Sequence, residues 1–377
     1  NMIKYLKYYI STFTLILAIY LITQGSYYPT FFFIGFSLFI ILGDYLIQED
    51  DIKDSYNFPV MINLPIYINF IFLFIFIIIS SSFFSEKESI WFLYLIENVF
   101  QVDNLFPFTP IHFIDKISLI FLLSLFIGII GTVPGHELIH RKKNKFDLFI
   151  GNWLLAFSWD CSFAVEHVQG HHKNVGLPKD PATAKRDENI YKFILKAILQ
   201  EHKDSWSFEL KEMKKKKYGY LSFRNKIIIG YARSLIITMT IFFSGGAMST
   251  LFYLICALLA KAFLEVINYT EHYGLVREPG KAVGVRHSWN SNSKLSSLYL
   301  FNVTRHSSHH EKASLKFWEL DPQKNGPRMP FGYLSMLYLA LFLPNTFHKV
   351  MREKIDHWDN NFATNGEKEI INKLYIK

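Results

Sequence analysis

Six stretches of the chain stay largely apolar over about 18 residues or more, the length that an α-helix needs to cross a hydrocarbon core about 30 Å thick. They cover residues 8–24, 27–47, 59–82, 116–134, 227–245 and 247–267. Only Gln24-Gly25-Ser26 separates the first two stretches and only Gly245-Gly246 the last two, so each pair predicts a tight helical hairpin. The pattern therefore predicts an all-α integral membrane protein with a bundle of six transmembrane helices.

Two long polar regions, 135–226 and 268–377, follow the fourth and sixth stretches. They carry aromatic and aliphatic residues at helical spacing, so we expect them to fold into a cap at one end of the bundle, with residues 1–377 forming a single domain. Two apolar segments, 91–100 and 331–343, are too short to span the bilayer and are expected to be interfacial helices. Pro344 should end the second of them.

The distribution of positive charge predicts the orientation of the bundle. Half of the residues are hydrophobic. About eighteen of the 40 Lys and Arg residues lie in the single connection 136–226. Because positive charge is enriched in cytoplasmic loops, we expect that connection to lie in the cytoplasm. With Lys4 and Lys7 before the first stretch, six spans then place both termini and the whole cap on the cytoplasmic side. We expect a multi-pass protein of a bacterial-type inner membrane, with the first stretch retained. The net charge of +8 reflects this topology and contact with the lipid bilayer, and no nucleic-acid partner is expected.

Only two cysteines occur, Cys161 and Cys256, and they lie far apart in the sequence. They cannot form a four-thiolate iron–sulfur or rubredoxin site, and we expect two reduced thiols. If the protein consumes electrons, another protein must deliver them.

The 14 histidines are unevenly distributed. Nine of them fall in four compact clusters within the expected cap. The clusters are His136 and His140; His167, His171 and His172; His272; and His306, His309 and His310. The other five are isolated, and we expect packing or hydrogen bonding rather than metal binding, even for His287 beside Arg286 and Ser288. They are His112, His202, His287, His348 and His357.

Three clusters space their histidines three or four residues apart, which places the rings on one face of a helix within reach of one metal ion. The first cluster, HELIH at 136–140, also matches the zinc-peptidase pattern, in which the glutamate is a general base. A hydrolytic zinc site needs only three protein ligands, whereas these three clusters offer eight. Imidazole suits iron as well as zinc. The surplus favours two iron ions with open positions for dioxygen, with a zinc peptidase as the alternative.

Acidic residues adjoin several of these histidines, namely Glu137, Glu166 and Glu271. A metal-bound histidine usually donates its second ring N–H to a carboxylate or a carbonyl, so these three carboxylates are candidates for that contact. Solvated surface charge is the alternative for each of them.

At these clusters the sequence resembles the membrane alkane 1-monooxygenases and the xylene-type monooxygenase hydroxylases, within the superfamily of fatty acid desaturases and hydroxylases. The resemblance covers about residues 115–345 and rests on four motifs taken together. They are HELIH at 136–140, EHVQGHH at 166–172, NYTEHYGL at 268–275 and RHSSHH at 305–310. The His-Tyr-Gly core of the third motif is typical of these hydroxylases rather than of ordinary desaturases.

The resemblance implies a non-haem di-iron centre held by the nine clustered histidines, with O2 as co-substrate and no catalytic residue beyond the metal ligands. It also implies electrons from a rubredoxin or ferredoxin-type carrier with its reductase. The expected reaction is hydroxylation of the terminal methyl group of a small hydrophobic substrate, an n-alkane giving a 1-alkanol. Residues 271–274 and 305–307 resemble the alkane branch, whereas 317–320, 329–330 and 363–369 resemble the xylene branch. An alkyl-aromatic monooxygenase therefore remains the alternative, and a fatty acid desaturase a further one.

Overall fold

The computed structural model describes residues 3–86, 98 and 109–375, and it is helical throughout these residues apart from loops and two isolated β-bridges. The all-α prediction is confirmed for this part of the chain. The helices of four or more residues before the second polar region are α1 (Ile3–Leu6), α2 (Ile10–Thr23), α3 (Tyr28–Leu46), α4 (Pro59–Ser82), α6 (Phe113–Phe126), η2 (Ile127–Thr132), α7 (Val133–Ile139), α8 (Lys145–Ala156), α9 (Phe163–Glu166), η3 (His167–His171), α11 (Ile190–Lys215) and α12 (Lys226–His272). Those after it are α13 (Lys294–Tyr299), α14 (His306–Glu311), α15 (Tyr333–Phe342), α16 (Pro344–Asn361) and α17 (Asn365–Tyr375).

Within the described part of the chain, five helices are long and apolar enough to cross a membrane, and they lie where the apolar stretches predict them. They are Lys4–Thr23, Tyr28–Leu46, Pro59–Ser82, Phe113–Ile139 and Lys226–His272. Many of their large apolar side chains face outward; Phe31 is 67% exposed and Leu42 is 52% exposed. Since a soluble protein seldom exposes a continuous apolar surface of this kind, the helices belong to a membrane protein.

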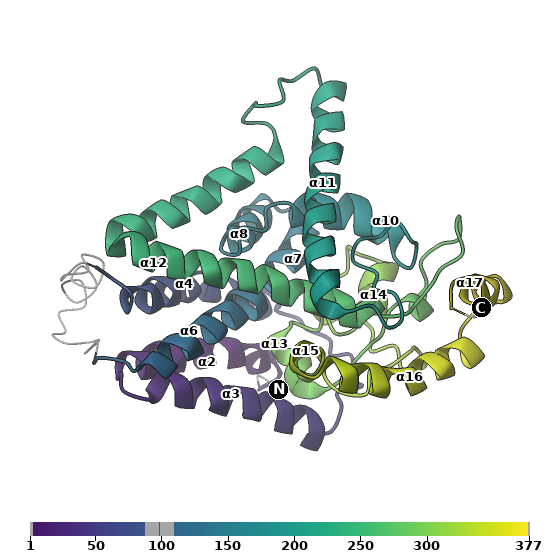
Figure 1. Ribbon diagram of the computed structural model, residues 1–377, viewed down its shortest axis with the longest axis horizontal. Helices are drawn as coiled ribbons and strands as arrows, with labels where there is room; N and C mark the ends of the chain where they lie inside the picture. The colour runs from purple at the N-terminus through teal and green to yellow at the C-terminus, as the bar shows by residue number, and fades with distance from the viewer. Residues whose placement is uncertain (1–2, 87–97, 99–108, 376–377) are drawn as a thin grey trace.

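The fifth of these helices, α12, has 47 residues and is broken at Gly246, whose φ of 84° and ψ of −166° are not helical. Two arms meet there, as Figure 1 shows at the left of the molecule. A straight helix of this length would measure about 70 Å, more than twice the hydrocarbon core. The hairpin expected at Gly245-Gly246 is therefore present as a sharp break within one helix, because glycine tolerates a positive φ.

Polar side chains within the bundle bond from helix to helix. Asn69 of α4 accepts a hydrogen bond from Thr12 of α2 at 2.6 Å and donates to Ser11 at 2.9 Å. Asp115 of α6 accepts from the Thr30 hydroxyl of α3 at 2.6 Å. Such pairs fix the helices relative to one another, since an unpaired polar group in an apolar bundle is costly.

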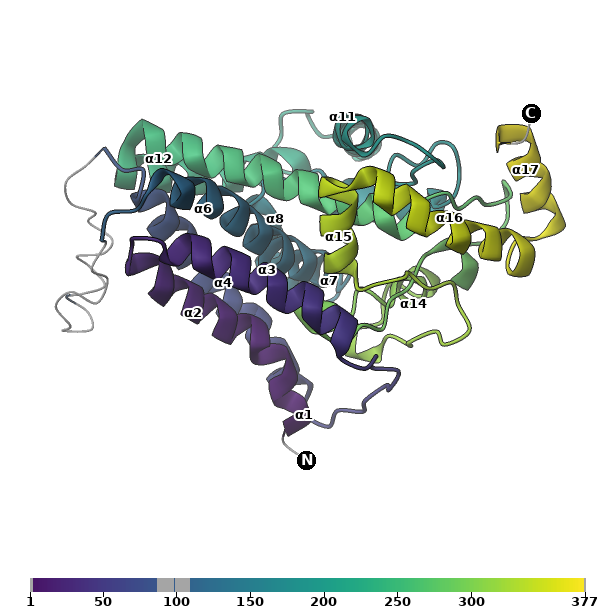
Figure 2. The ribbon, with the colours of Figure 1, turned by 60° about the horizontal axis from the view of Figure 1, so that its bottom comes forward.

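The remaining helices gather at one end of the bundle. In Figures 1 and 2, α2, α3, α4, α6 and the second arm of α12 run side by side, and α7 and α14 lie toward their right-hand end. The three-residue helix α10 (His172–Asn174), labelled in Figure 1, lies at the same end. The apolar segment at 331–343 forms the ten-residue helix α15, which ends before Pro344 as the sequence predicts; a further helix, α16, begins at Pro344. Of the other expected interfacial segment, 91–100, all residues except Asn98 lie outside the described part of the chain.

Both cysteines are buried and free, as expected. Burial raises the pKa of the Cys161 thiol to about 12, so this thiol stays protonated at neutral pH. It is a structural side chain.

Candidate metal centre

All nine clustered histidines come together at the end of the bundle where α7, η3, α10, α12 and α14 meet. They form two groups in which the candidate ligand atoms of each group lie within 4.8 Å of one another. The first group contains His136, His140, His167, His172 and His309; the second contains His171, His272, His306 and His310. Two adjacent groups are what two metal ions would require.

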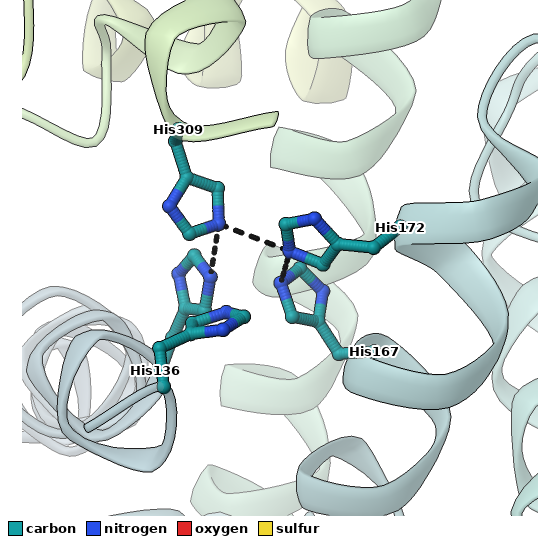
Figure 3. A group of neighbouring side chains, drawn as sticks. His136, His167, His172 and His309 are labelled. Carbon is teal, nitrogen blue, oxygen red and sulfur yellow. Dashed lines mark hydrogen bonds between the residues drawn. The ribbon is translucent and has the colours of Figure 1, made fainter. Parts of the chain in front are cut away.

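In the first group, the Nε2 atoms of four histidines lie close to one another (Figure 3). His136 Nε2 lies 3.0 Å from His309 Nε2, His309 Nε2 lies 3.2 Å from His172 Nε2, and His172 Nε2 lies 3.0 Å from His167 Nε2. Figure 3 shows these rings pointing at one another from three separate elements, α7, the η3–α10 segment and α14. His140 completes the group, with its ring centroid 4.8 Å from that of His309.

The second group is arranged in the same way. His306 Nε2 lies 3.2 Å from His272 Nε2 and 2.9 Å from His310 Nε2. The His171 ring packs against the rings of His272 and His310, with both centroid separations at 5.0 Å. All four side chains are buried.

Three neighbouring histidines, His167, His171 and His172, divide between the two groups because η3 is a π-helix. The wider π turn aligns residues five apart, so His167 and His172 face the same group and His171 faces the other. The spacing of four expected for His167 and His171 is therefore not the pairing in the structure. In the first and fourth clusters the spacing of four does hold, since His136 pairs with His140 and His306 with His310.

The ring nitrogens fit a metal ion better than they fit one another. A neutral ring nitrogen carries either one proton or one lone pair, so His172 Nε2 cannot form good hydrogen bonds with both of its neighbours at once. Nitrogens bound at about 2.1 Å to one ion lie about 3 Å apart when the angle at the ion is near 90°. Two further atoms, His140 Nε2 and His171 Nε2, are buried without a hydrogen-bond partner among the described residues. The two histidine sets therefore fit two metal ions.

Two contacts fix the orientation of rings in the second group. His171 Nδ1 donates to both carboxylate oxygens of Asp180 at 3.1 Å, and His272 Nδ1 donates to the backbone oxygen of His287 at 3.0 Å. Each contact holds the proton on Nδ1 and leaves Nε2 free for a metal, as is usual for metal-binding histidines. The sequence analysis did not identify Asp180. The available signal was its position in a short Pro-Lys-Asp-Pro loop, eight residues after His172.

The three acidic residues singled out in the sequence occupy different environments. Glu271 Oε2 lies 3.2 Å from His306 Nε2, on the side of the ring that faces the second group. Glu137 Oε1 instead accepts hydrogen bonds from Arg141 at 2.8 and 3.1 Å and from the Phe317 backbone. Glu137 is the glutamate that would be the general base in a zinc peptidase, but here its carboxylate is paired with Arg141.

Glu166, the third of these acidic residues, is buried beside η3, and burial raises the pKa of its carboxyl to about 8. Burial alone would lower the pKa of His171, but the negative charge of Asp180 and its hydrogen bond raise this pKa above its usual value.

Six of the other clustered histidines are held in the neutral form. Burial, with repulsion from neighbouring histidines, lowers the pKa of His140, His167 and His309 well below the usual value and that of His172 to about 2. The same causes act on His306 and His310. Neutral imidazole is the form that binds a metal ion, so no proton has to be removed at neutral pH.

The five isolated histidines lie outside both groups. His287 is fully buried, where its Nε2–H donates to Glu367 at 2.8 Å and its Nδ1 accepts from the Gly284 backbone at 2.9 Å. Its side chain therefore hydrogen bonds, while its backbone oxygen orients His272. His202 and His348 bond to the hydroxyls of Tyr231 and Tyr269.

These observations define a class of protein: a membrane protein, helical in its described part, with nine histidines in two adjacent groups that could each hold a metal ion at one end of its bundle. The model of the fatty acid desaturase family matches residues 117–340, more than half of the chain and all nine histidines. The chain belongs to the fatty acid desaturase family.

Curated relatives place the chain among the monooxygenases of this family. It is 35% identical over 263 residues to alkane 1-monooxygenase 2 of Alcanivorax borkumensis, a match covering 68% of each chain. It is 34% identical over 247 residues to alkane 1-monooxygenase 2 of Pseudomonas aeruginosa, covering 64% of this chain and 65% of the relative. The xylene/toluene monooxygenase hydroxylase component of Pseudomonas putida is 30% identical over 242 residues, with coverage of 64% and 65%. The chain is thus an oxygen-dependent oxidoreductase of the monooxygenase type, and each match spans about two thirds of the relative.

Proposed function

We propose that this chain is a di-iron monooxygenase that hydroxylates the terminal methyl group of an n-alkane to give a 1-alkanol. The observation that carries the proposal is the division of the nine histidines into groups of five and four. The balanced reaction takes one O2, two electrons and two protons, places one oxygen atom in the new C–O–H group and releases the other as water. The substrate class rests on the alkane 1-monooxygenase relatives.

One ion would be held by the five-histidine group and the other by the four-histidine group, with the Glu271 carboxylate as a further candidate ligand beside His306. When bound, the two iron ions would supply the activation of O2. The protein holds six of the nine histidines neutral, orients His171 and His272 through their Nδ1 protons, and keeps water away by burial. Iron fits better than zinc because each group offers four or five ligands, more than the three protein ligands that a catalytic zinc site takes.

The electrons would come from a separate carrier protein of the rubredoxin or ferredoxin type, itself reduced by a reductase. His140 and His172 are the least buried of the nine histidines, and each is followed within two residues by an exposed lysine, Lys142 or Lys173. Burial is the main cause of the lowered pKa values of His140 and His172, and the charge of Lys142 contributes to both. A positive surface beside the most accessible ligands favours an acidic electron carrier.

The same proposal includes the membrane topology. Counting the two arms of α12 separately gives six spans, and the cationic 136–226 connection then lies in the cytoplasm with the metal centre and both termini, in a bacterial-type inner membrane. The break at Gly246 supports this count, because each arm alone has the length of one span.

Hydroxylation of an alkyl-aromatic methyl group is a second candidate, favoured by the match to the xylene/toluene hydroxylase component. Desaturation of a fatty acid is a third, suggested by the family itself. The test is to express the chain with a rubredoxin and its reductase, supply n-alkanes mixed with alkylbenzenes, and identify the products. We expect 1-alkanols. If only benzylic alcohols form, the substrate is an alkyl-aromatic compound rather than an alkane. If the product carries a new double bond and no added oxygen, the reaction is desaturation rather than hydroxylation.

A further inference from the structure

A buried lysine, Lys261 of α12, lies among three carboxylates. Its Nζ atom is 2.7 Å from Glu201 Oε2, 2.7 Å from Glu265 Oε1 and 2.9 Å from Asp160 Oδ2. The four residues are at most 6% exposed, and they come from α11, from α12 and from the loop before α9. We call these four residues the Lys261 cluster. None of them belongs to the histidine groups, and the hydroxylation proposed above assigns them no part.

The Lys261 cluster carries more negative than positive charge. If all four groups were ionised, three carboxylates would face one ammonium group, and two negative charges would be buried without compensation. A buried charge is costly unless it is paired, so a carboxyl group in such surroundings takes up a proton instead. Burial raises the pKa of Asp160, and burial together with repulsion from Glu265 raises the pKa of Glu201 well above its usual value.

The hydrogen bonds of the cluster leave places for such a proton. Asp160 Oδ2 and Glu265 Oε1 lie within ion-pair distance of the ammonium group but have no hydrogen-bond partner among the described residues. The second oxygen of each carboxyl accepts a hydrogen bond at 3.1 Å, from Ser162 in Asp160 and from Asn268 in Glu265. Two buried carboxyl oxygens are therefore available to carry a proton.

One phenyl ring links the Lys261 cluster to the five-histidine group. Lys261 Nζ lies 5.8 Å from the centroid of the Phe163 ring. The same ring packs against the rings of His167 and His136, with centroid separations of 4.5 and 5.6 Å. Charges that are separated by an apolar ring in a protein interior interact strongly, because little solvent screens them. The cluster therefore responds to the charge of the metal centre.

Bound metal ions would change this charge. Six of the nine histidines are held neutral, so they bring no negative charge to the ions. Divalent ions add positive charge to a buried site, and positive charge nearby favours the ionised form of a carboxyl group. The ions would thus favour loss of the proton from the cluster.

We propose that the Lys261 cluster holds a proton while no metal is bound and releases it when divalent iron binds, so that its carboxylates compensate the charge of the metal centre. This inference rests on the proposed metal centre and adds to it an acid–base site that couples iron binding to pH. The proton leaves a carboxyl O–H bond and passes to the solvent, and the ammonium group of Lys261 stabilises the carboxylate that remains. Iron affinity therefore rises with pH.

Four other titratable groups interact with the cluster: Glu166 of α9, His171 of η3, His202 of α11 and Cys161. Burial lowers the pKa of His202 and raises that of Cys161, so both are neutral at neutral pH. Glu166 and His171 belong to the surroundings of the histidine groups and can release protons of their own. The test therefore compares variants that differ from the wild type only within the Lys261 cluster.

The test titrates the metal-free protein in detergent with Fe²⁺ under anaerobic conditions. It measures the protons released per chain by calorimetry in buffers of different ionisation enthalpy, together with the number of ions bound. Glu201→Gln and Asp160→Asn keep the size of the side chain and remove one proton-binding group each. We expect each variant to bind as many ions as the wild type, to release about one proton per chain fewer, and to show an iron affinity that rises less steeply with pH.

Glu209→Gln is the matched control. Glu209 is also a fully buried glutamate of α11, but it lies eight residues beyond Glu201, about 12 Å along the helix. Its Oε1 accepts a hydrogen bond from the Lys226 backbone at 2.8 Å, which a glutamine oxygen can also accept. We expect this variant to release as many protons as the wild type. If the cluster only joined α11 to α12, its variants would be less stable and would still release the wild-type number of protons.

Wild-type proton release in both cluster variants, with the ions bound, would overturn the inference and leave the proposed function intact. An equal decrease in Glu209→Gln would also overturn it, since the protons would not then come from the Lys261 cluster. If Glu201→Gln does not fold, the result for Asp160→Asn decides. A wild type that binds no iron would instead overturn the proposed function on which this role of the cluster rests.

Discussion

The Nε2 atoms of His167 and His172 lie 3.0 Å apart although the two residues are five positions apart, because the π-helical turn η3 aligns them. His171, directly before His172, belongs to the other group. Adjacent residues should therefore serve different metal sites. We predict that His171→Ala and His172→Ala each lower the metal content from two ions per chain to about one, with the lost ion at opposite positions in anomalous scattering maps. Loss of the same ion in both variants would contradict the division.

Asp180 accepts the Nδ1 proton of His171 at 3.1 Å and so fixes the ring. Replacing Asp180 by Asn keeps the shape but removes the charge, and we predict about a 10–100-fold weaker binding of one metal ion, measured by competition with a chelator. Asp356→Asn, at an exposed position of α16, is the control and should leave both affinities unchanged. An Asp180→Asn protein with wild-type affinity would show that this carboxylate does not support the site.

The Arg141 side chain, which is 8% exposed, lies between two carboxylates, at 2.8 Å from Glu137 and 3.2 Å from Asp147, and also donates to Asn63. Removing the cation would leave two buried negative charges facing each other. We predict that Arg141→Ala lowers the free energy of unfolding by about 3–5 kcal/mol in detergent. The exposed neighbour Lys143 provides the comparison, and Lys143→Ala should change the free energy of unfolding by about 0.5 kcal/mol or less. Equal effects of the two substitutions would contradict the importance of the ion pairs.

Glu367 connects the C-terminal helix α17 to the loop that carries His287. Burial raises the pKa of its carboxyl, but hydrogen bonds from His287 and Arg286 outweigh burial and lower it from 4.5 to about 2. A carboxyl with a lowered pKa in the folded state stabilises the protein above about pH 4.5, and this contribution is lost as the pH falls toward 2.

We therefore predict that the wild type loses stability between pH 4.5 and 2, followed by tryptophan fluorescence because Trp358 donates to the Arg286 backbone in this contact. The Glu367→Gln variant should be less stable than the wild type at pH 7, and its stability should fall less than that of the wild type between pH 4.5 and 2. Parallel acid profiles for the two proteins would exclude Glu367 as the group responsible.

Much of the fold could be predicted because the length of an apolar run decides whether a helix can cross a membrane. The same reasoning identified α15 as too short and located the turn at Gly245-Gly246. The gathering of the histidines could be predicted from their clustering at one end of the apolar stretches. Which group each one joins could not, because helical spacing assumes an α-helix and η3 is a π-helix. The contact of Asp180 with His171 depends on the path of the loop after η3, which helical spacing does not encode.

The central claim is that the two histidine groups support insertion of an oxygen atom from O2 into a C–H bond. The most direct measurement is the mass of the 1-octanol formed from octane under ¹⁸O2 by the purified chain with its iron, supplied with a rubredoxin, its reductase and NADH. The account predicts one ¹⁸O atom in each molecule of 1-octanol. An alcohol whose oxygen comes from water, or no alcohol from a protein that carries two iron ions, would contradict it.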